Sequence, residues 1–424
     1  MSLLVLCLLI TLLLIVRVPI AFAFIGPSLG YLMTNDQSIG LALRLVANST
    51  ASFPLLAVPL FILLGCLANH AGIADRLFEF ALAVLGRVRG SLGYVSVGVS
   101  VGFSWMSGSA VADAAALGKL QIPAMLRSGY SKRFALGVTG SAALIAPVMP
   151  PSIPAVVYAG LAAVSTGALF AASVVPALLM ALGLCIVVFI WVRKDDNIHR
   201  TEFSWARVWV TGRRVIAPLG APVVILGGIL GGLFTPTEAA AVGAAYMAIL
   251  GFAYRTLRLR DVPKVLVETV VVSASIMLIV ASANLLGYAF ARERVPQELS
   301  ELVLGFTSDA TVFLLLVFAL SMVLGTALDA IAVLTLTVPI LLPISANYGV
   351  DPIALGVLMI VSQMIGLLTP PVGTVIFVLQ AIARARMSEV FWGALPFMVP
   401  MVLLCLAIIF WPEAMLYLPR ELGL

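Results

Sequence analysis

The sequence predicts an all-α integral membrane protein, arranged as a polytopic inverted repeat with two re-entrant hairpins and two discontinuous helices. Three observations predict it: an extreme composition, motif spacings that recur in two halves, and helix-breaking residues inside apolar stretches. Of 424 residues, 62% are hydrophobic and 10% are charged, whereas a soluble domain has about 45–50% and 25%. A water-soluble globule is therefore excluded. Apolar spans of about 20 residues would give this chain about ten to twelve membrane segments.

The charged residues are distributed as in a membrane protein. The formal net charge is +5, and the basic residues lie in short runs between apolar stretches. Such runs are typical of cytoplasmic loops rather than of a nucleic-acid-binding surface, so we expect no nucleic-acid partner. The cysteines lie inside apolar runs without ligand-like spacing, so we expect neither disulfides nor a metal site. They are Cys7, Cys66, Cys185 and Cys405.

Residues 1–47 form the predicted N-terminal membrane segment. The first apolar run, 2–16, has no basic residue before it, and hydrophobicity resumes directly after Pro19. A secretory signal would begin with a basic region. We therefore expect a retained span that is interrupted near Pro19.

Motif spacings found in the first half of the chain recur in the second half. Asp113 and Asp329 each precede a proline by ten positions, and Pro151 and Pro371 each precede another proline by 25. Asn69-His-Ala-Gly72 stands before Asp113 at nearly the same distance as Asn284-Leu-Leu-Gly287 stands before Asp329. The recurrence predicts two homologous halves, repeat 1 at 48–192 and repeat 2 at 265–412. A C-terminal tail follows at 413–424.

Loop charge predicts that the two halves are inserted in opposite orientations. Three basic residues lie between 127 and 133, whereas the matching loop of the second half, 343–352, has none. Conversely, 161–168 is uncharged, and its counterpart carries Arg384 and Arg386. Because basic loops stay in the cytoplasm, equivalent loops face opposite sides of the membrane.

The segment between the halves, 193–264, contains the most polar stretch of the chain. Its first part, 193–214, has six basic and three acidic residues. We predict a cytoplasmic amphipathic arm there, a surface-lying helix that contains Trp205 and Trp209. Two scaffold spans follow, at about 215–233 and 239–254.

The joint between these two spans fits a capping box. Thr235 would cap the second span, Pro236 would occupy the first helical position, and Glu238 would accept a hydrogen bond from a free backbone N–H. For Glu238 this structural role is favoured over a role in transport.

Each half contains two places where the backbone breaks inside an apolar stretch. The first is a predicted re-entrant hairpin, at 91–126 in repeat 1 and at 311–342 in repeat 2. The second is a broken helix, at 134–160 and at 353–383, with two adjacent prolines in each. Because proline removes a backbone donor and clashes with the preceding turn, paired prolines beside Gly or Ser stop a helix.

The four breaks are expected to converge on one site near the midplane of the bilayer. Irregular backbone at membrane depth is tolerated only where it is buried in protein or lines a polar cavity. The exposed C-terminal carbonyls of half-helices suit a small cation, and the N-terminal N–H groups suit an anion. The sequence therefore predicts a site for a coupled cation and an anionic substrate.

Hydroxyl side chains cluster at the breaks, where oxygen ligands suit a hard cation such as Na⁺. Any single hydroxyl is as readily explained by a hydrogen bond to its own preceding turn. The group comprises Ser107, Ser109, Ser152, Thr326, Thr369 and Thr374.

Asp113 and Asp329 are acidic residues among apolar neighbours. Each is either a functional acid or a carboxylate that stabilises the N-terminus of a helix. Asn284 and Gln363 either line the cavity or form interhelical hydrogen bonds. The pair Asn69-His70 is expected to end a span at an interface.

Four motifs resemble a known family. They are Ser107-Gly-Ser-Ala-Val-Ala-Asp113, Met149-Pro-Pro-Ser-Ile-Pro154, Phe234-Thr-Pro-Thr-Glu-Ala-Ala-Ala241 and Leu368-Thr-Pro-Pro-Val-Gly373. Over nearly its whole length the chain resembles the large membrane (M) subunit of tripartite ATP-independent periplasmic (TRAP) transporters. The resemblance implies sodium-coupled uptake, across the bacterial cytoplasmic membrane, of a small organic acid anion that a periplasmic substrate-binding protein delivers. It also implies a small four-helix membrane (Q) subunit, expected as a separate chain because the large-subunit pattern begins almost at Met1.

The resemblance further implies an elevator-type ion transporter fold, in which the hairpins and broken helices slide against a scaffold. No cofactor is implied other than Na⁺ as the coupling ion. The implied sodium-site residues are Ser107, Gly108, Ser109, Met149, Pro150 and Ser152 in the first half, and Gly325, Thr326, Thr369, Pro370 and Gly373 in the second. The candidate residues of the substrate cavity are Asp113, Ser152, Asp329, Gln363 and Thr374.

Other function classes fit the sequence less well. The chain has no nucleotide-binding Gly-x-x-x-x-Gly-Lys-Ser/Thr loop, so energy must come from an ion gradient. An enzyme is not expected, because there is no Gly-x-Ser-x-Gly elbow and the two histidines are His70, near a span end, and His199, in the polar loop. A channel with re-entrant filter loops is the alternative, although paired breaks in inverted halves favour alternating access. Dicarboxylates, sugar acids and other small carboxylates are all open as substrates.

Overall fold

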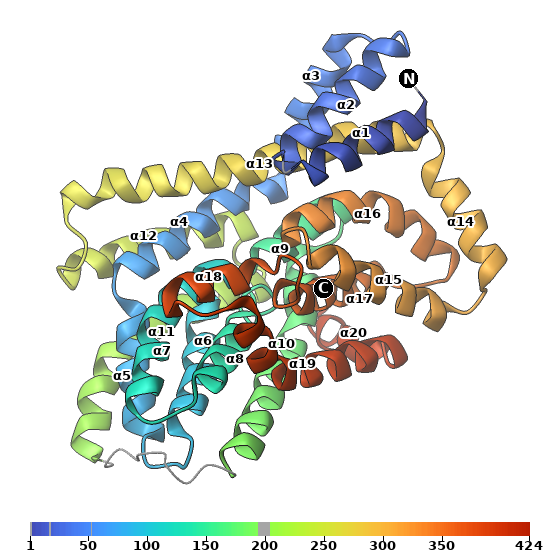
Figure 1. Cartoon of the computed structure of the whole chain (residues 1–424). Coiled ribbons are helices and arrows are strands. Elements are labelled where there is room, and N and C mark those ends of the chain that lie inside the picture. Colours follow the sequence, from blue (N-terminus) through green and yellow to red (C-terminus); the bar gives the residue numbers. More distant parts are fainter. Residues whose placement is uncertain (1, 17, 52, 194–203) are drawn as a thin grey trace.

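The computed structural model describes residues 2–16, 18–51, 53–193 and 204–424, and this part of the chain folds into helices without a β-strand (Figure 1). The predicted all-α fold is confirmed. Six of the described helices are long and apolar enough to cross a membrane. This is fewer than the ten to twelve segments expected, because the hairpins and interrupted helices divide several spans into shorter apolar pieces.

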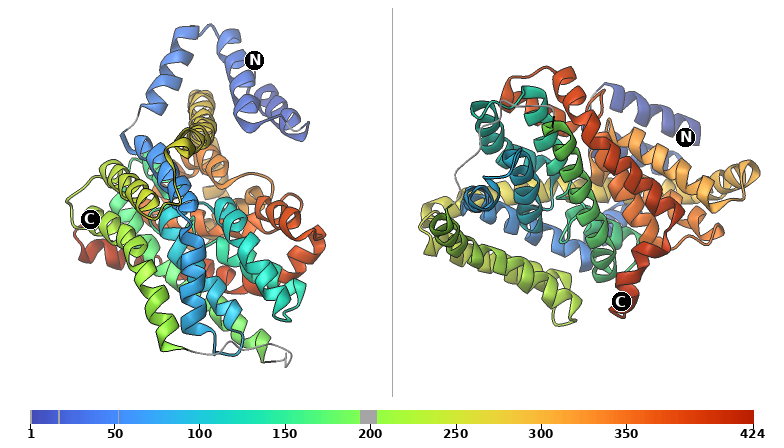
Figure 2. Two further views of the ribbon diagram at one scale, coloured as in Figure 1. Left: turned by 90° about the vertical axis from the view of Figure 1, so that its left-hand side faces the viewer. Right: turned by 90° about the horizontal axis from the view of Figure 1, so that it is seen from below.

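Three N-terminal helices form a group at one corner of the molecule (Figures 1 and 2). They are α1 (Leu3–Ile15), α2 (Ile20–Thr34) and α3 (Ile39–Thr50). The interruption predicted near Pro19 is confirmed, since α1 ends before this residue and α2 begins after it. The group packs along the later part of α13 (Val262–Arg292), where Phe24 and Leu286 share a small apolar core.

The first half contains one helical hairpin and one interrupted helix. Its elements are η1 (Phe53–Leu56), α4 (Ala57–His70), α5 (Ile73–Leu85), α6 (Ser91–Ser107), α7 (Ala110–Arg127), α8 (Lys132–Ala143), α9 (Ile153–Ala162) and α10 (Thr166–Val192). We call α6 and α7 hairpin 1. The irregular segment 144–152 between α8 and α9 is break 1.

The second half repeats this order after α11 (Trp205–Leu230), α12 (Pro236–Ala253) and η2 (Leu259–Asp261). Its elements are α13, α14 (Val295–Phe306), α15 (Ala310–Gly325), α16 (Ala330–Asn347), α17 (Pro352–Leu367), α18 (Thr374–Ala383), α19 (Met387–Phe410) and α20 (Glu413–Glu421). We call α15 and α16 hairpin 2, and the segment 368–373 break 2. In Figure 1 the base of hairpin 1 lies at the lower left and that of hairpin 2 at the right, with both tips toward the centre.

The register between the halves is set by the helices rather than by the aspartates. Helix α7 begins at Ala110, and its counterpart α16 begins at Ala330. The residue just before each start is an N-cap, so Ser109 corresponds to Asp329. The pairing of Asp113 with Asp329 that the sequence suggested is therefore wrong by one helical turn, because Asp113 lies in the first turn of α7.

A second motif pairing from the sequence is also wrong. Gly72 follows the end of α4 at φ +68°, a left-handed conformation that glycine adopts without steric cost. Its supposed counterpart, Gly287, lies inside α13. The two motifs therefore have different backbone conformations.

The region between the halves agrees with the sequence in one feature and differs in another. The capping box is confirmed, because Thr235 Oγ1 accepts from the Glu238 N–H at 3.3 Å and Glu238 Oε2 accepts from the Thr235 N–H at 2.8 Å. However, α11 continues from Trp205 to Leu230 without a break near Arg214. A separate surface-lying helix that ends at 214 is absent from the described residues, and 194–203 of the predicted arm lie outside them.

The interrupted helix of the first half packs directly on the second half. A Cβ atom on Gly137 of α8 would lie 2.0 Å from the carbonyl oxygen of Gly393 in α19. One on Gly393 would lie 2.2 Å from the carbonyl oxygen of Arg133. Only glycine allows two backbones to approach so closely, so this crossing joins the two halves.

Candidate functional site

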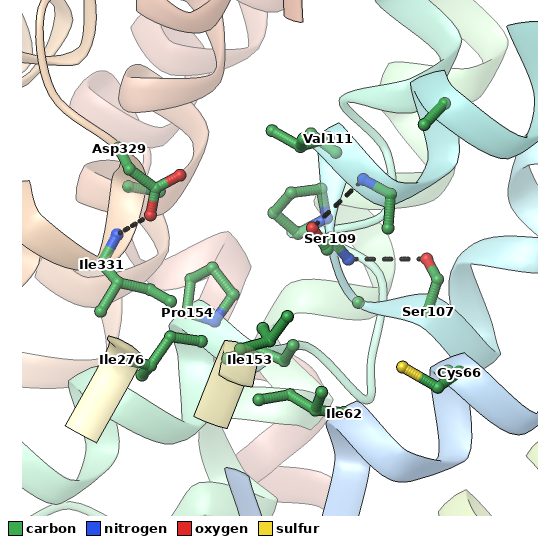
Figure 3. Close-up of a pocket in the computed structure, with 18 of the residues that line it drawn as sticks. Ile62, Cys66, Ser107, Ser109, Val111, Ile153, Pro154, Ile276, Asp329 and Ile331 are labelled. Atoms are coloured by element: carbon green, nitrogen blue, oxygen red, sulfur yellow. Dashed lines mark hydrogen bonds between the residues drawn. The ribbon is translucent and has the colours of Figure 1, made fainter. Parts of the chain in front are cut away.

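The tip of hairpin 1, break 1 and the start of α16 in hairpin 2 border one cavity of about 530 Å³ (Figure 3). The tip of hairpin 1, break 1 with the start of α9, and the start of α16 at the tip of hairpin 2 form much of its wall. Leu367, the last residue of α17, adds the edge of break 2. Helices α4 and α13 close the other side. The predicted convergence holds for the two hairpins and break 1, whereas residues 368–373 of break 2 do not line this cavity. Its position near the midplane of the bilayer stays a prediction.

The tip of hairpin 1 packs against break 1. Helix α6 ends at Ser107, Gly108 turns the chain at φ +59°, and Ser109 caps α7 by accepting from the Ala112 N–H at 3.4 Å. A Cβ on Gly108 would lie 3.1 Å from the Pro151 carbonyl oxygen, which is tighter than an ordinary contact. The turn therefore needs glycine both for its conformation and for its closeness to break 1.

The tip of hairpin 2 is bonded to break 2 through the backbone. The carbonyl oxygen of Thr326 accepts from the N–H groups of Val372, at 3.2 Å, and Gly373, at 3.0 Å. Asp329 caps α16 by accepting from the Ile331 N–H at 3.2 Å. A Cβ on Gly366 would lie 2.5 Å from the carbonyl carbon of Gly325, so α17 touches the end of α15 directly.

Asp113 lies behind the tip of hairpin 1 rather than in the cavity wall. Its side chain is fully buried, and Ser107 Oγ donates a hydrogen bond to one carboxylate oxygen. The other carboxylate oxygen has no hydrogen-bond partner among the described residues. Ser107 Oγ also accepts from the Ser109 N–H at 3.5 Å. This arrangement supports the turn, and a role of Asp113 in transport stays a prediction.

The hydroxyl groups at the breaks differ in their hydrogen-bond partners. Thr326 and Thr369 donate to carbonyl oxygens of their own preceding turns, those of Val323 and Ile365, each at 2.8 Å. Ser109 and Ser152 instead act as helix caps, Ser152 by accepting from the Ala155 N–H at 3.2 Å. The hydroxyl of Thr374 and both polar side-chain atoms of Gln363 are buried without a partner among the described residues.

Some of the sequence-predicted site residues line the cavity, and the others do not. Ser107, Gly108, Ser109 and Asp329 line the cavity. The others that were predicted do not line it. They are Asp113, Met149, Pro150, Ser152, Gly325, Thr326, Gln363, Thr369, Pro370, Gly373 and Thr374. Their roles in binding sodium or substrate stay predictions.

Residues 6–414 match the family described as "Tripartite ATP-independent periplasmic transporter, DctM component". The chain belongs to this family. The predicted family is thus confirmed, and the match spans both hairpins and both breaks.

Curated relatives of this DctM-family chain are membrane permeases. The "Sialic acid TRAP transporter large permease protein SiaM" of Vibrio cholerae is 38% identical over 410 residues, which cover 96% of each chain. The "C4-dicarboxylate TRAP transporter large permease protein DctM" of Pseudomonas aeruginosa is 36% identical over 394 residues, covering 93% of this chain and 92% of that protein. Sequence relatives are named as transporter components rather than enzymes, as expected.

A longer sequence relative and a solved structure are also similar to this chain. The "Sialic acid TRAP transporter permease protein SiaT" of Haemophilus influenzae is 34% identical over 96% of this chain, which covers 66% of that protein. The crystal structure of the Alcanivorax borkumensis YdaH transporter, described as having an unusual topology, superposes with a TM-score of 0.62 at 15% identity and covers 87% of each chain. That likeness confirms the transporter fold.

The part of the cavity wall that α4 and α13 form in this DctM-family chain was not foreseen from the sequence. Gly65 of α4 lets the hairpin tip approach, because a Cβ there would lie 3.2 Å from the carbonyl oxygen of Met106. Glu268 of α13 lines the cavity with 46% of its side chain exposed, and its Oε2 lies 4.0 Å from Nε2 of His70. His70 Nδ1 in turn lies 2.9 Å from the Cys66 carbonyl oxygen. An acidic residue within an apolar span was the available signal for Glu268.

Proposed function

We propose that this chain carries out sodium-coupled uptake of a small organic acid anion by elevator-type alternating access. The observation that carries the proposal is one cavity bordered by the tip of hairpin 1, break 1, the start of α16 in hairpin 2 and the end of α17. Helix N-termini at a cavity favour an anion, and helix C-termini with carbonyl oxygens favour a cation. One cavity can therefore hold both in adjacent positions.

The cavity wall supports alternating access. One side consists of the two hairpins and interrupted helices, and the other of α4 and α13. Along α13 the cavity extends from Ile279 to Glu268, toward the end where the helix begins. This end follows a basic run, Arg255, Arg258, Arg260 and Lys264. Because basic segments stay in the cytoplasm, the cavity is directed inward, as a release state would be.

We propose the same partners and location that the family implies. A periplasmic substrate-binding protein delivers the acid, and a small four-helix membrane subunit, as a separate chain, completes the scaffold in the bacterial cytoplasmic membrane. The names of relatives support organic acids as the substrate class, since they include sialic acid and C4-dicarboxylate permeases.

Reconstituted uptake tests the proposal. The large and small subunits in liposomes should accumulate a labelled acid when an inward sodium gradient and a loaded binding protein are both present. Equal accumulation without sodium would contradict the coupling. Equilibration without accumulation, independent of the binding protein, would instead indicate the channel alternative.

A matched pair of serine variants tests the sodium site. Ser109→Ala removes a hydroxyl at the cavity, and Ser165→Ala removes an equivalent N-cap hydroxyl at the start of α10, which accepts from the Ala168 N–H at 3.2 Å. Ser109→Ala should raise the sodium concentration for half-maximal uptake, whereas Ser165→Ala should leave it unchanged. The same sodium dependence in both variants would remove Ser109 from the sodium site.

A further inference from the structure

One ion pair connects α4 and α13, the two helices that close the cavity opposite the hairpins. His70 is the last residue of α4, and Glu268 lies near the start of α13. His70 Nε2 lies 4.0 Å from Glu268 Oε2, and both side chains are partly exposed. Glu268 lines the cavity together with Cys66 and Asn69 of α4. The pair therefore belongs to the cavity wall and is accessible to water.

The hydrogen bonding of His70 determines where its ring hydrogen lies. Nδ1 lies 2.9 Å from the carbonyl oxygen of Cys66. Because a carbonyl oxygen only accepts, Nδ1 carries the hydrogen. In a neutral imidazole Nε2 is then an acceptor, and it faces the carboxylate of Glu268, which is also an acceptor when ionised. Two such groups repel each other, whereas one proton bound by the pair makes their interaction attractive.

The elements around α4 offer no second charged partner to His70. They are η1, α5, α6, α9, α12 and α13. Of these, η1, α6 and α9 contain no charged residue, and the one charged residue of α12 is Glu238 in its first turn, at the end remote from His70. Helix α5 begins with Asp75 and Arg76, and the Arg76 guanidinium lies over the ring of Tyr254, 3.7 Å from its centroid. The other titratable group of α4 is the Cys66 thiol.

The charged residues near Glu268 on its own side are Lys264 and those of η2. Lys264 precedes Glu268 by one helical turn, but no ion pair within 4.0 Å among the described residues includes it. In η2, Asp261 accepts from the Arg258 N–H at 3.0 Å. Helices α2 and α3 pack along the later part of α13, and α14 follows its end. The charged residues of α3 and α14 are Arg44, Glu298 and Glu301.

A proton on this pair sets the charge of the cavity wall. Among the described residues that line the cavity, the charged ones are Glu268 and Asp329. Asp329 accepts from the Ile331 N–H at 3.2 Å, and the positive end of α16 offsets its charge. Glu268 has only His70 as a charged partner within 4.0 Å among the described residues. The pair is neutral overall with one bound proton and carries one negative charge without it.

We propose that His70 and Glu268 form a proton-binding site through which the pH on the cytoplasmic side controls the return of a released anion to the cavity. With the proton bound, the neutral wall lets the anion enter again. Without the proton, the negative charge of Glu268 repels the anion, because like charges placed together weaken binding. The anion and the inward direction of the cavity rest on the proposed function.

Inhibition of uptake from inside proteoliposomes tests this site. A binding protein added outside selects transporters with their periplasmic side outward, so the lumen corresponds to the cytoplasm. Uptake of labelled acid is measured against unlabelled acid in the lumen at pH of about 6 and about 8.5, the range in which histidine changes its charge, with the outer pH constant. Labelled N-acetylneuraminate is the first probe and fumarate the second, because both stay ionised over this range.

The luminal acid concentration that halves uptake should be at least about threefold higher at the higher luminal pH, because the unprotonated pair repels the anion. Equal concentrations at the two pH values overturn the proposal, while sodium-driven accumulation leaves the proposed function standing. If neither acid accumulates with a sodium gradient, the proposed function fails, and this inference fails with it.

Two substitutions hold the wall in its two charge states. Glu268→Gln removes the carboxylate, and the new amide can donate to His70 Nε2, so the half-inhibiting concentration should stay at the low-pH value at both pH values. His70→Gln leaves Glu268 charged throughout, so the concentration should stay at the high-pH value. A purely structural contact between α4 and α13 would shift both variants in the same direction, and that result overturns the proposal. If His70→Gln fails to fold, retained pH dependence in Glu268→Gln is sufficient to overturn it.

Glu79→Gln is the matched control. Glu79 Oε2 lies 3.9 Å from Nη1 of Arg214, so this substitution also removes the acid of a partly exposed ion pair, but Glu79 does not line the cavity. The variant should keep the full pH dependence of the unaltered protein. Loss of the pH dependence in Glu79→Gln as well would show that the luminal pH does not act through His70 and Glu268.

Discussion

Break 1 is buried throughout residues 144–152, whereas break 2 is partly open, with Thr369 and Pro370 half-buried and Pro371 exposed. The tips of the hairpins follow the same order, since Gly108 is buried and Ala327 is exposed. Both halves therefore share the backbone plan but not the surroundings. The duplicated helices therefore set where the chain breaks, and contacts with distant residues set how much of each break is buried.

The two hairpins are also held in different ways. Within hairpin 1, side chains join its two helices, through Ser96 to Gln121 and Ser107 to Asp113. At hairpin 2, the Thr326 carbonyl binds the tip to break 2, and a close glycine contact holds it against α17. Removing a side chain should therefore affect the first half more strongly. Adding a methyl group to a glycine at the tip contact should affect hairpin 2 more strongly.

The largest effect is expected for Gly366→Ala. The new Cβ would lie 2.5 Å from the carbonyl carbon and 2.7 Å from the Cα of Gly325. Both are backbone atoms, which cannot move aside as a flexible side chain can. Overpacking costs about 1–3 kcal/mol and occasionally more, and a backbone clash belongs to the upper end. The thermal unfolding midpoint in detergent, with the yield of monodisperse protein, measures the loss.

Gly98→Ala is the control for this variant. Gly98 lies in α6, and a Cβ there meets no heavy atom within 4 Å. Because alanine favours a helix by about 0.5–1 kcal/mol relative to glycine, Gly98→Ala should be neutral or slightly stabilising. A Gly366→Ala protein with the same yield and midpoint as Gly98→Ala would show that the tip contact is not close.

The next effect is expected for Ser107→Ala in hairpin 1. This change removes the hydroxyl that donates to the buried carboxylate of Asp113. The other oxygen of that carboxylate already has no partner among the described residues. Leaving a buried polar group without its partner costs about 1–3 kcal/mol, and more for a charged group. Thermal unfolding should show a lower midpoint.

Ser321→Ala in hairpin 2 provides the comparison. Ser321 is fully buried in α15, and its hydroxyl has no hydrogen-bond partner among the described residues. Its removal should therefore leave the unfolding midpoint nearly unchanged. If both serine variants lost the same stability, the difference between the hairpins would not lie in their side-chain hydrogen bonds.

The features that could be predicted from the sequence were those set by local residues. Paired prolines stop a helix wherever it packs, so both breaks were found. The hairpin tips were found from polar residues and glycine within apolar stretches. The capping box at Thr235 was likewise predicted because its partner Glu238 is three residues away. The convergence of the breaks followed from the rule that irregular backbone in a membrane needs cover.

The features that were missed depend on contacts between distant residues. Asp113 and Asp329 look equivalent in sequence, but only the helix starts show that Ser109 is the counterpart of Asp329. Glu268 lines the cavity from α13, and Gly65 of α4 lies against the tip of hairpin 1. Local spacing in the sequence gives no information about either position. The continuous α11 was missed because its polar beginning and apolar remainder differ in composition but not in backbone conformation.

A smaller effect is expected for Tyr158→Phe. Each interrupted helix contacts the other half of the chain where it begins. Lys132 starts α8 and Pro352 starts α17, which are corresponding helices of the two halves. The buried Tyr158 hydroxyl donates to the Pro352 carbonyl oxygen at 2.5 Å. Tyr158→Phe should therefore cost about 1 kcal/mol, the net value of one such hydrogen bond. A thermal unfolding midpoint equal to that of the unaltered protein would show that this hydrogen bond does not stabilise the fold.

The smallest effect is expected for the corresponding contact at α8. Lys132 Nζ lies 3.3 Å from the Arg384 carbonyl oxygen and 3.4 Å from Glu389 Oε2, but the two charged side chains are 36% and 37% exposed. Exposed ion pairs contribute about 0.2–1 kcal/mol or less and are weakened by salt. Lys132→Met keeps the apolar stem and should lower the midpoint less than Tyr158→Phe, with the difference from the unaltered protein vanishing at about 1 M salt. If Lys132→Met lowered the midpoint more than Tyr158→Phe did, and still did so in salt, the contact at α8 would hold the two halves together more strongly than the contact at α17.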